Sequence, residues 1–296
     1  MTVLHQKATG WSSLRVTNTK VHVWHASLQQ PVEVVQKLEA VLSEEERQRV
    51  ERFRFQEHRQ SFIVSRGILR DLLYRYTGIE PGRIRFKYNL AGKPFLANEE
   101  AVAEIYFNLS HAGQLVLYAF SWGCQVGIDV ECIRPMEEMD LVAERIFSPG
   151  EYDRFRKISE EDKLRAFYNC WTRKEAFIKA IGEGLSFPLS QFEVSFVPND
   201  LAELVSVQGS REKASLWTMH DLKTRDGYAA ALVVDGKDHS ISHKQWMDFS
   251  FYEPGLAGPL FRTSRALPEN RYTLWRIISF CDIIQLVYLV YFLTLR

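Results

Sequence analysis

The sequence predicts an α+β fold built from two similar lobes, each with helices packed on a small antiparallel sheet. In both halves, strong helical patterns come before a group of short strand patterns. Each half also contains a helix start with a glutamate three residues after a serine. We expect an N-terminal lobe over 1–130, a C-terminal lobe with a long helix over 131–251, and a linker with an apolar tail over 252–296.

The first half opens with an alternating strand, VHVWH, at 21–25. Helical patterns follow over 32–42, after the capping box of Ser43 and Glu46, and over about 59–76. Gly78 is expected to end the last of these helices. Strand patterns then cover 84–88, 105–109, 115–120 and 126–131.

The second half repeats this order. Ser148 to Glu151, with Pro149 at the first helical position, predicts a helix start. A long helix is expected over 160–181, ended by Gly182. Strand patterns follow over 192–197, 215–219 and 228–234, and the compact pattern fades after about Phe251.

Composition restricts the class of protein. An apolar fraction of 46% is ample for a packed core, so a disordered chain is excluded. Lysines plus arginines and aspartates plus glutamates both number 37, which does not indicate a nucleic-acid partner. The four cysteines lack zinc-site spacing and indicate reduced thiols in a cytoplasmic protein without a secretory signal. They are Cys124, Cys132, Cys170 and Cys281.

An apolar run at 277–295 has the length of a membrane span. Asp282 lies inside it, and a charged residue at mid-span costs about 2.5–3.5 kcal/mol on insertion scales. Three readings stay open: a poorly inserting tail anchor, an element that packs on the body, or a segment extraneous to the functional domain.

Two short segments carry the strongest chemical signal. Asp129 and Glu131 are two residues apart, so on a strand they leave the same face. Glu175 and Lys179 are four apart and share a helix face. Taken singly, these pairs could be a solvated strand end and a surface ion pair. Taken together, three carboxylates suit a hard cation such as Mg²⁺.

Other polar segments favour anion binding. Ser110 and His111 end a predicted strand, and no G-x-S-x-G elbow supports a hydrolase. The arginine-rich segment 47–70 offers phosphate contacts among many carboxylates, and Lys93 lies at a predicted tight turn. No Walker A or G-x-G-x-x-G loop is present.

Five ordered segments together resemble the 4′-phosphopantetheinyl transferase superfamily, in its larger surfactin-synthetase-activating (Sfp) type. The resemblance covers about 21–234, and the sequence is similar in character to cyanobacterial members of the family. The segments are 92–94 (GKP), 107–111 (FNLSH), 127–131 (GIDVE), 147–151 (FSPGE) and 171–179 (WTRKEAFIK).

The resemblance implies a pseudo-twofold fold and a transferase. This enzyme would move the phosphopantetheine arm of coenzyme A onto a serine of an acyl or peptidyl carrier protein and release 3′,5′-ADP. By the same resemblance, Mg²⁺ would be held against the pyrophosphate by Asp129, Glu131 and Glu175. Lys179 would stabilise phosphate charge or protonate the leaving group. Glu175 or a metal-bound water would take the serine proton.

The resemblance also implies a coenzyme A site and a monomeric protein. The residues expected to bind coenzyme A are Arg49, Arg54, Arg66, Lys93, Ser110, His111 and Lys179. Two other hypotheses remain: a catalytically inactive module that binds a carrier protein or nucleotide, and a tail-anchored membrane adaptor.

Overall fold

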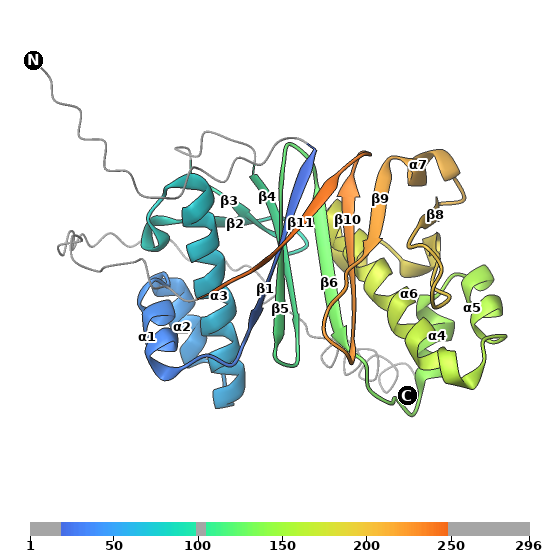
Figure 1. The fold of residues 1–296 in the computed structure, drawn as a ribbon, viewed down its shortest axis with the longest axis horizontal. Coiled ribbons are helices and arrows are strands. Elements are labelled where there is room, and N and C mark those ends of the chain that lie inside the picture. The colour runs from blue at the N-terminus through green and yellow to red at the C-terminus, as the bar shows by residue number, and fades with distance from the viewer. Residues whose placement is uncertain (1–18, 99–104, 248–296) are drawn as a thin grey trace, which may run out of the picture.

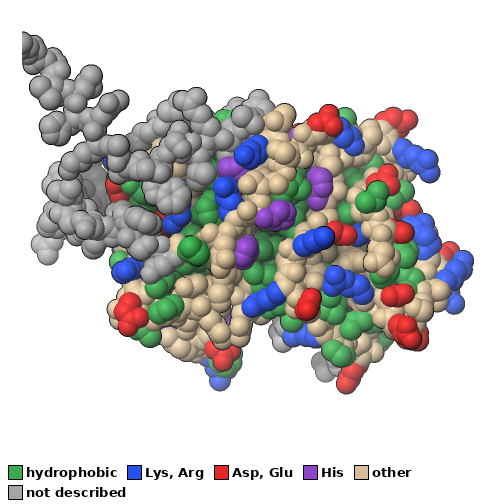
Figure 2. All heavy atoms as spheres, viewed as in Figure 1, with side chains coloured by type: hydrophobic (Ala, Val, Ile, Leu, Met, Phe, Trp, Pro, Cys, Tyr) green, Lys and Arg blue, Asp and Glu red, His purple; other side chains and the backbone are tan. Residues whose placement is uncertain are grey.

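The computed structural model describes residues 19–98 and 105–247. Two lobes lie side by side, with their sheets facing each other in the middle and their helices outside (Figure 1). Acidic and basic side chains are interspersed over the C-terminal lobe on the face shown in Figure 2. No helix within these ranges is long and apolar enough to cross a membrane. The apolar run at 277–295 lies outside the described residues.

The N-terminal lobe packs helices on one face of a sheet. Its sheet has the order β11-β1-β5-β4, where β11 is Ser240–Gln245, and β5 is antiparallel to both β1 and β4. Its helices are α1 (Val32–Ala40), α2 (Glu44–Glu51), α3 (Gln56–Thr77) and the short η1 (Pro81–Arg83). Its strands are β1 (Lys20–Ser27), β4 (Ile105–Ala112), β5 (Leu115–Trp122) and the hairpin of β2 (Phe86–Tyr88) and β3 (Pro94–Leu96).

The C-terminal lobe repeats this plan with a sheet of order β6-β10-β9, antiparallel throughout. Its helices are α4 (Met139–Ile146), α5 (Pro149–Phe155), α6 (Glu160–Ile181), α7 (Arg211–Ser215) and the short η2 (Gly184–Ser186) and η3 (Leu189–Gln191). Its strands are β6 (Val126–Cys132), β7 (Phe192–Val194), β8 (Leu204–Val207), β9 (Trp217–Asp221) and β10 (Tyr228–Asp235).

The predicted α+β class is confirmed, but the structure divides the chain differently from the predicted break after residue 130. Strand β6 pairs along its whole length with β10, so residues 126–130 belong to the C-terminal sheet. After β10 the chain returns to the N-terminal lobe, where β11 (Ser240–Gln245) pairs in parallel with β1. The lobes are therefore joined by two crossings of the described chain.

Apolar side chains form three buried clusters, and the middle one joins the lobes. It lies between the two sheets and includes Val23 and Leu117 from one lobe with Ile128 and Leu232 from the other. The outer clusters fill the space between each sheet and its helices. Val126, Ile128 and Val130 of β6 lie in the middle cluster. Because side chains alternate along a strand, the intervening Asp129 and Glu131 point to the other face of β6, toward α6.

Close packing of β6 on α6 depends on Gly127. A Cβ atom at this position would overlap the carbonyl oxygen of Ala176 and the amide nitrogen of Ala180. All the obstructing atoms are backbone atoms, so no side-chain rotation could make room. The glycine and the two small alanines therefore allow strand and helix backbones to touch.

We predict that Gly127→Ala destabilises the protein strongly. Overpacking of a core costs typically about 1–3 kcal/mol, and contact with rigid backbone places this variant at or above the upper end. Urea unfolding followed by circular dichroism measures the change. Gly82→Ala is the matched control, because an added Cβ there meets nothing within 4 Å. Equal stability of the two variants would contradict this account of the β6–α6 contact.

Candidate functional site

Strand β6 and helix α6 bring the predicted acidic residues together. Asp129 and Glu131 lie on the face of β6 that packs on α6, and Glu175 lies on α6. All three are almost fully buried, with exposed fractions of 2%, 9% and 8%. Burial of three carboxylates requires compensating positive charge or hydrogen bonds.

Lys179 supplies that charge. Its Nζ donates to Asp129 Oδ1 at 2.7 Å and to Ser110 Oγ at 3.0 Å. The Ser110 hydroxyl donates in turn to the same Asp129 oxygen at 2.8 Å. Ser110 comes from β4, so this small network crosses from the C-terminal lobe to the N-terminal lobe. The structure thus unites three of the predicted site residues.

The acidic cluster remains under electrostatic strain. Burial, and then the negative charge of Asp129, raises the pKa of Glu131 well above its usual range. The same two causes raise the pKa of Glu175 to about 7, although Lys179 opposes the shift. The indole of Trp171 donates to Glu131 Oε1 at 3.3 Å and gives this carboxylate a hydrogen bond. A further positive charge would therefore be favourable at this site.

Two buried oxygen atoms in the cluster lack a hydrogen-bond partner: Asp129 Oδ2 and Glu175 Oε1. Buried carboxylate oxygens without partners suit a bound cation. Over residues 19–98 and 105–247, however, no group of three or more His, Cys, Asp or Glu side chains is arranged to hold a metal ion. The donor types thus fit Mg²⁺, whereas a ready three-carboxylate cage is not present.

His111 is neutral near pH 7. Burial is the main cause that lowers the pKa of its imidazole to about 4, with a further contribution from Lys179. His58 also lowers this pKa, whereas Asp129 acts against the shift. A neutral imidazole can still donate one hydrogen bond to an anion.

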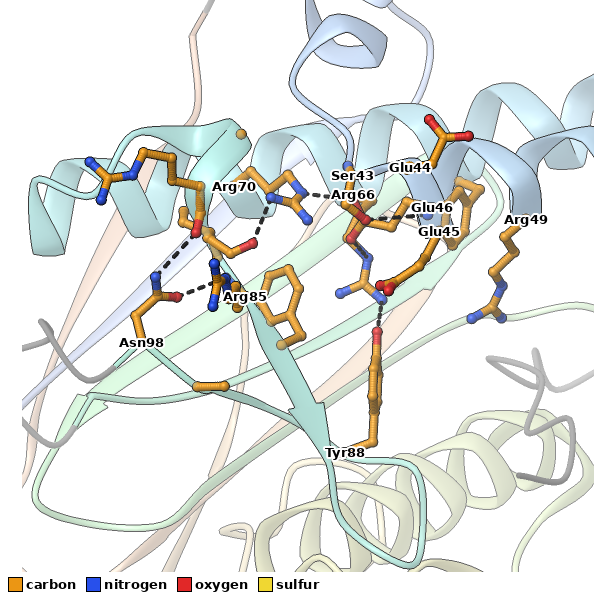
Figure 3. A pocket seen from close by; sticks show the side chains of 16 residues that line it. Ser43, Glu44, Glu45, Glu46, Arg49, Arg66, Arg70, Arg85, Tyr88 and Asn98 are labelled. Atoms are coloured by element: carbon orange, nitrogen blue, oxygen red, sulfur yellow. Dashed lines mark hydrogen bonds and ion pairs between the residues drawn. The ribbon is translucent and has the colours of Figure 1, made fainter. Parts of the chain in front are cut away.

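A pocket of about 850 Å³ opens in the N-terminal lobe, between α2, α3, η1 and the β2–β3 hairpin (Figure 3). Arg49 and Arg66, two of the residues expected to bind coenzyme A, both line it. Arg66 Nε lies 3.3 Å from Glu46 Oε1, and its Nη2 donates to Tyr88 at 3.2 Å. Its Nη1 is buried and has no hydrogen-bond partner. Arg66 therefore lines the pocket and carries a buried N–H without a hydrogen-bond partner.

Sequence reasoning missed part of the pocket wall. Arg83, Arg85, Tyr88 and Asn98 also line it. The first two follow the predicted turn and had a charge signal, but nothing in the local pattern marks Tyr88 or Asn98 as site residues.

Two predicted coenzyme A residues lie elsewhere. Arg54 is exposed, stacks over the ring of Phe55 and does not line the pocket. Lys93 does not line it either, and its Nζ donates to the backbone oxygens of Val126 and Ala180. Their roles in coenzyme A binding stay predictions that these contacts do not support.

Comparison with known proteins gives consistent matches over both lobes. Residues 125–233 match the family model described as the 4′-phosphopantetheinyl transferase superfamily. Residues 23–122 match the model described as 4′-phosphopantetheinyl transferase, N-terminal.

Individual relatives match over different lengths. The chain is 38% identical over 224 residues to 4′-phosphopantetheinyl transferase HetI of Nostoc sp., covering 76% of this chain and 91% of the relative. It is 32% identical to 4′-phosphopantetheinyl transferase Sfp of Bacillus subtilis, over 52% of this chain and 66% of that one. A holo-[acyl-carrier-protein] synthase structure from Thermotoga maritima is 29% identical, with a TM-score of 0.30, over 38% of this chain and 63% of that one.

We predict that Lys179→Met destabilises the metal-free protein by about 3–5 kcal/mol at pH 8, because it leaves buried carboxylates unpaired. The loss should be smaller at pH 5.5. Without Lys179 the folded-state pKa values of Glu131 and Glu175 rise further. At pH 5.5 these carboxyl groups can stay protonated in the folded protein, whereas at pH 8 they must ionise while buried, which lowers the free energy of unfolding.

Urea unfolding with EDTA at both pH values tests this. Lys163→Met is the control, because Lys163 bridges the exposed Asp140 and Glu160. Such surface pairs contribute at most about 1 kcal/mol. A Lys179→Met loss no larger than the control's would show that Lys179 does not stabilise the acidic cluster.

Proposed function

The chain belongs to the 4′-phosphopantetheinyl transferase superfamily, and we propose that it transfers the phosphopantetheine arm of coenzyme A to a serine of an apo carrier protein, with Mg²⁺ as cofactor and 3′,5′-ADP as the second product. The observation that carries this proposal is the buried cluster of Asp129, Glu175 and Lys179, completed by Ser110 from the other lobe. A cluster of opposite charges with unpartnered oxygens can accommodate both a cation and phosphate oxygens.

Asp129 and Glu175 are the residues that would hold Mg²⁺, through the two buried oxygens that have no hydrogen-bond partner. Glu131 lies beside them and its raised pKa reflects the same excess of negative charge. When bound, Mg²⁺ would neutralise charge on the pyrophosphate of coenzyme A. Because Mg²⁺ prefers about six oxygens and keeps several waters, two protein carboxylates plus phosphate oxygens form a suitable set.

Lys179 would stabilise the negative charge that develops on the leaving group. Burial opposes its charged form, but Asp129 and Glu175 outweigh this effect and the pKa of its ammonium is raised. The group therefore stays protonated near neutral pH. It can donate a hydrogen bond, or a proton, to the 3′,5′-ADP oxygen as the phosphorus–oxygen bond breaks.

The remaining step removes the proton of the carrier serine as its oxygen attacks phosphorus. Glu175, whose pKa is raised to about 7, can accept that proton directly or through a water. Transfer of the phosphoryl group depends mainly on positioning and charge neutralisation, which the rigid β6–α6 contact favours.

The pocket lined by Arg49 and Arg66, called the arginine pocket below, would bind the nucleotide end of coenzyme A. Arg49 lies over the ring of Phe62, with its guanidinium carbon 5.0 Å from the ring centroid, and Arg66 offers an unpartnered N–H. Guanidinium groups bind phosphates by paired hydrogen bonds, so these two arginines are suited to the 3′-phosphate. His111, neutral and beside Lys179, would contribute one hydrogen bond to a phosphate.

The two competing hypotheses gain no support from the described residues. An inactive binding module would have no use for a complete Asp129–Ser110–Lys179 network, which is intact here. The segment on which a membrane adaptor depends lies outside the described residues.

We predict that Asp129→Ala and Glu175→Ala each reduce transfer by at least about a hundredfold, because each removes a charged group that acts on the transition state. Labelling of an apo carrier protein with a fluorescent coenzyme A, with and without Mg²⁺, measures the rate. Glu160→Ala, on the exposed first turn of α6, is the control and should keep full activity.

A second measurement separates metal binding from catalysis. Mg²⁺ should raise the melting temperature of the wild-type protein but not that of Asp129→Ala. Full activity in both alanine variants, or unchanged stabilisation by Mg²⁺ in Asp129→Ala, would refute the assignment of the carboxylates.

We also predict that Arg49→Ala raises KM for coenzyme A at least about tenfold, since a charged hydrogen bond to phosphate is worth about 1.5–3 kcal/mol. The preference for coenzyme A over 3′-dephospho-coenzyme A should fall by the same factor. Arg54→Ala is the matched control, because Arg54 lies outside the pocket. Steady-state kinetics with both substrates measures these changes. A higher KM in Arg54→Ala but not in Arg49→Ala would show that the 3′-phosphate binds outside this pocket.

A further inference from the structure

The turn between β2 and β3 rests against the C-terminal end of α6, although the two belong to different lobes. Asn89 Nδ2 donates to the backbone oxygen of Gly182 at 2.6 Å. Lys93 Nζ donates to the backbone oxygen of Ala180 at 3.1 Å. The last four carbonyl groups of a helix have no partner inside the helix, and its C-terminus attracts cations. The turn supplies hydrogen-bond donors to carbonyl groups at the end of α6, and the ammonium of Lys93 supplies the positive charge.

The same ammonium group also reaches β6. Lys93 Nζ donates to the backbone oxygen of Val126 at 3.0 Å and lies 3.4 Å from Gln125 Oε1. Val126 is the first residue of β6, three residues before Asp129, and Ala180 directly follows Lys179. One side chain therefore ties together the two elements that carry the acidic cluster.

The turn is built to deliver this lysine. Asn89 Oδ1 accepts hydrogen bonds from the backbone N–H groups of Ala91 and Lys93, at 3.0 and 2.8 Å. Gly92 has a φ of 79°, a conformation that glycine adopts at no steric cost. A Cβ at Gly182 would lie 2.9 Å from Asn89 Nδ2. The turn and the helix end are thus in direct contact.

The surroundings of Lys93 differ from those of a phosphate-reading lysine. Its three hydrogen-bond partners are neutral oxygens, and no carboxylate is among them. Burial lowers the pKa of its amino group to about 8. The arginine pocket is lined by other residues. The hydrogen bonds of the Lys93 ammonium are therefore made to the protein itself and not to a ligand in the pocket.

We propose that Lys93 is a positioning residue, which fixes the end of α6 against the start of β6 so that Lys179 and Asp129 keep their contact. This inference deepens the proposed transferase function and rests on it. It gives the side chain of the Gly92-Lys93-Pro94 turn a role through α6 and not through the nucleotide.

Hydrogen exchange of backbone amides at the end of α6, in substrate-free protein, tests the contact without any assay of activity. Lys93→Met should increase exchange at residues 179–184 about tenfold or more, because the charged link to Ala180 and Val126 is lost. Lys93→Arg keeps the charge and should restore part of the protection. Unchanged exchange in Lys93→Met would overturn the proposal.

Kinetics then distinguish positioning from nucleotide binding. The positioning role predicts a kcat about tenfold lower in Lys93→Met, with KM for coenzyme A within about twofold of wild type. A higher KM with unchanged kcat and exchange would show that Lys93 binds the nucleotide.

Two further variants serve as references. Lys87→Met removes an exposed lysine of the same hairpin and should change neither measurement. Asn89→Ala removes the neighbouring bond to Gly182 and should also increase exchange at 179–184. If Lys93→Met does not fold, Asn89→Ala carries the test, and normal exchange in it would refute the contact. Transfer activity of Asp129→Ala tests the proposed function, whereas hydrogen exchange of the Lys93 and Asn89 variants tests the positioning role, so failure of one can be told from failure of the other.

Discussion

The contact between the backbones of β6 and α6 is the constraint on which the site depends. Gly127 lets the strand lie directly on Ala176 and Ala180 of the helix. This packing places Asp129 and Glu131 against Glu175 and removes all three from water. Burial raises the pKa values of the two glutamates, and a single ammonium, that of Lys179, offsets the repulsion. The demand for further positive charge is thus a consequence of backbone geometry.

The two lobes repeat one plan but differ in chemistry. Helices α3 and α6 both have 22 residues and end at a left-handed glycine. Asp71 and Arg75 precede Gly78 by the same intervals as Glu175 and Lys179 precede Gly182.

The first strands of the two lobes differ in charge. Strand β1 carries no Asp or Glu, whereas β6 carries Asp129 and Glu131. Asp71 is paired with Arg75 at 2.6 Å and accepts from the indole of Trp246 at 2.7 Å. One lobe therefore keeps three acids under strain, while in the other a lone acid is satisfied by a cation and an indole.

Local patterns predicted the elements that carry the site but not the contacts between them. Periodicity and glycine stops gave the bounds of α6 correctly, and both capping boxes, at Ser43 and Ser148, are present. Strand β11 was missed because its half-exposed side chains do not alternate clearly, and its partner β1 lies at the opposite end of the chain. The bond between Ser110 and Lys179 spans the lobes, and whether Arg49 or Arg54 enters the pocket depends on which way α2 and its following turn face. Such information is tertiary, and no local pattern contains it.

The capping-box glutamates show how the two lobes specialise in opposite directions. Glu151 is fully buried, and Lys174 binds its carboxylate at 2.7 Å while donating to the backbone oxygens of Leu189 and Phe192. Glu46 holds the equivalent place, with Arg70 at 2.7 Å in the position of that lysine.

Near Glu46 the fold stays open. Arg66, one turn before Arg70, also contacts Glu46 and keeps one N–H without a partner at the pocket wall. In the C-terminal lobe the unpartnered buried atoms of the acidic cluster are the carboxylate oxygens of Asp129 and Glu175. In the N-terminal lobe the Arg66 guanidinium and one oxygen of Glu46 each keep an atom without a hydrogen-bond partner, beside the closed Glu46–Arg70 ion pair. Under the proposed function, a ligand with a phosphate at one end and a cation-binding pyrophosphate at the other would contact both lobes, so each lobe would supply part of one site.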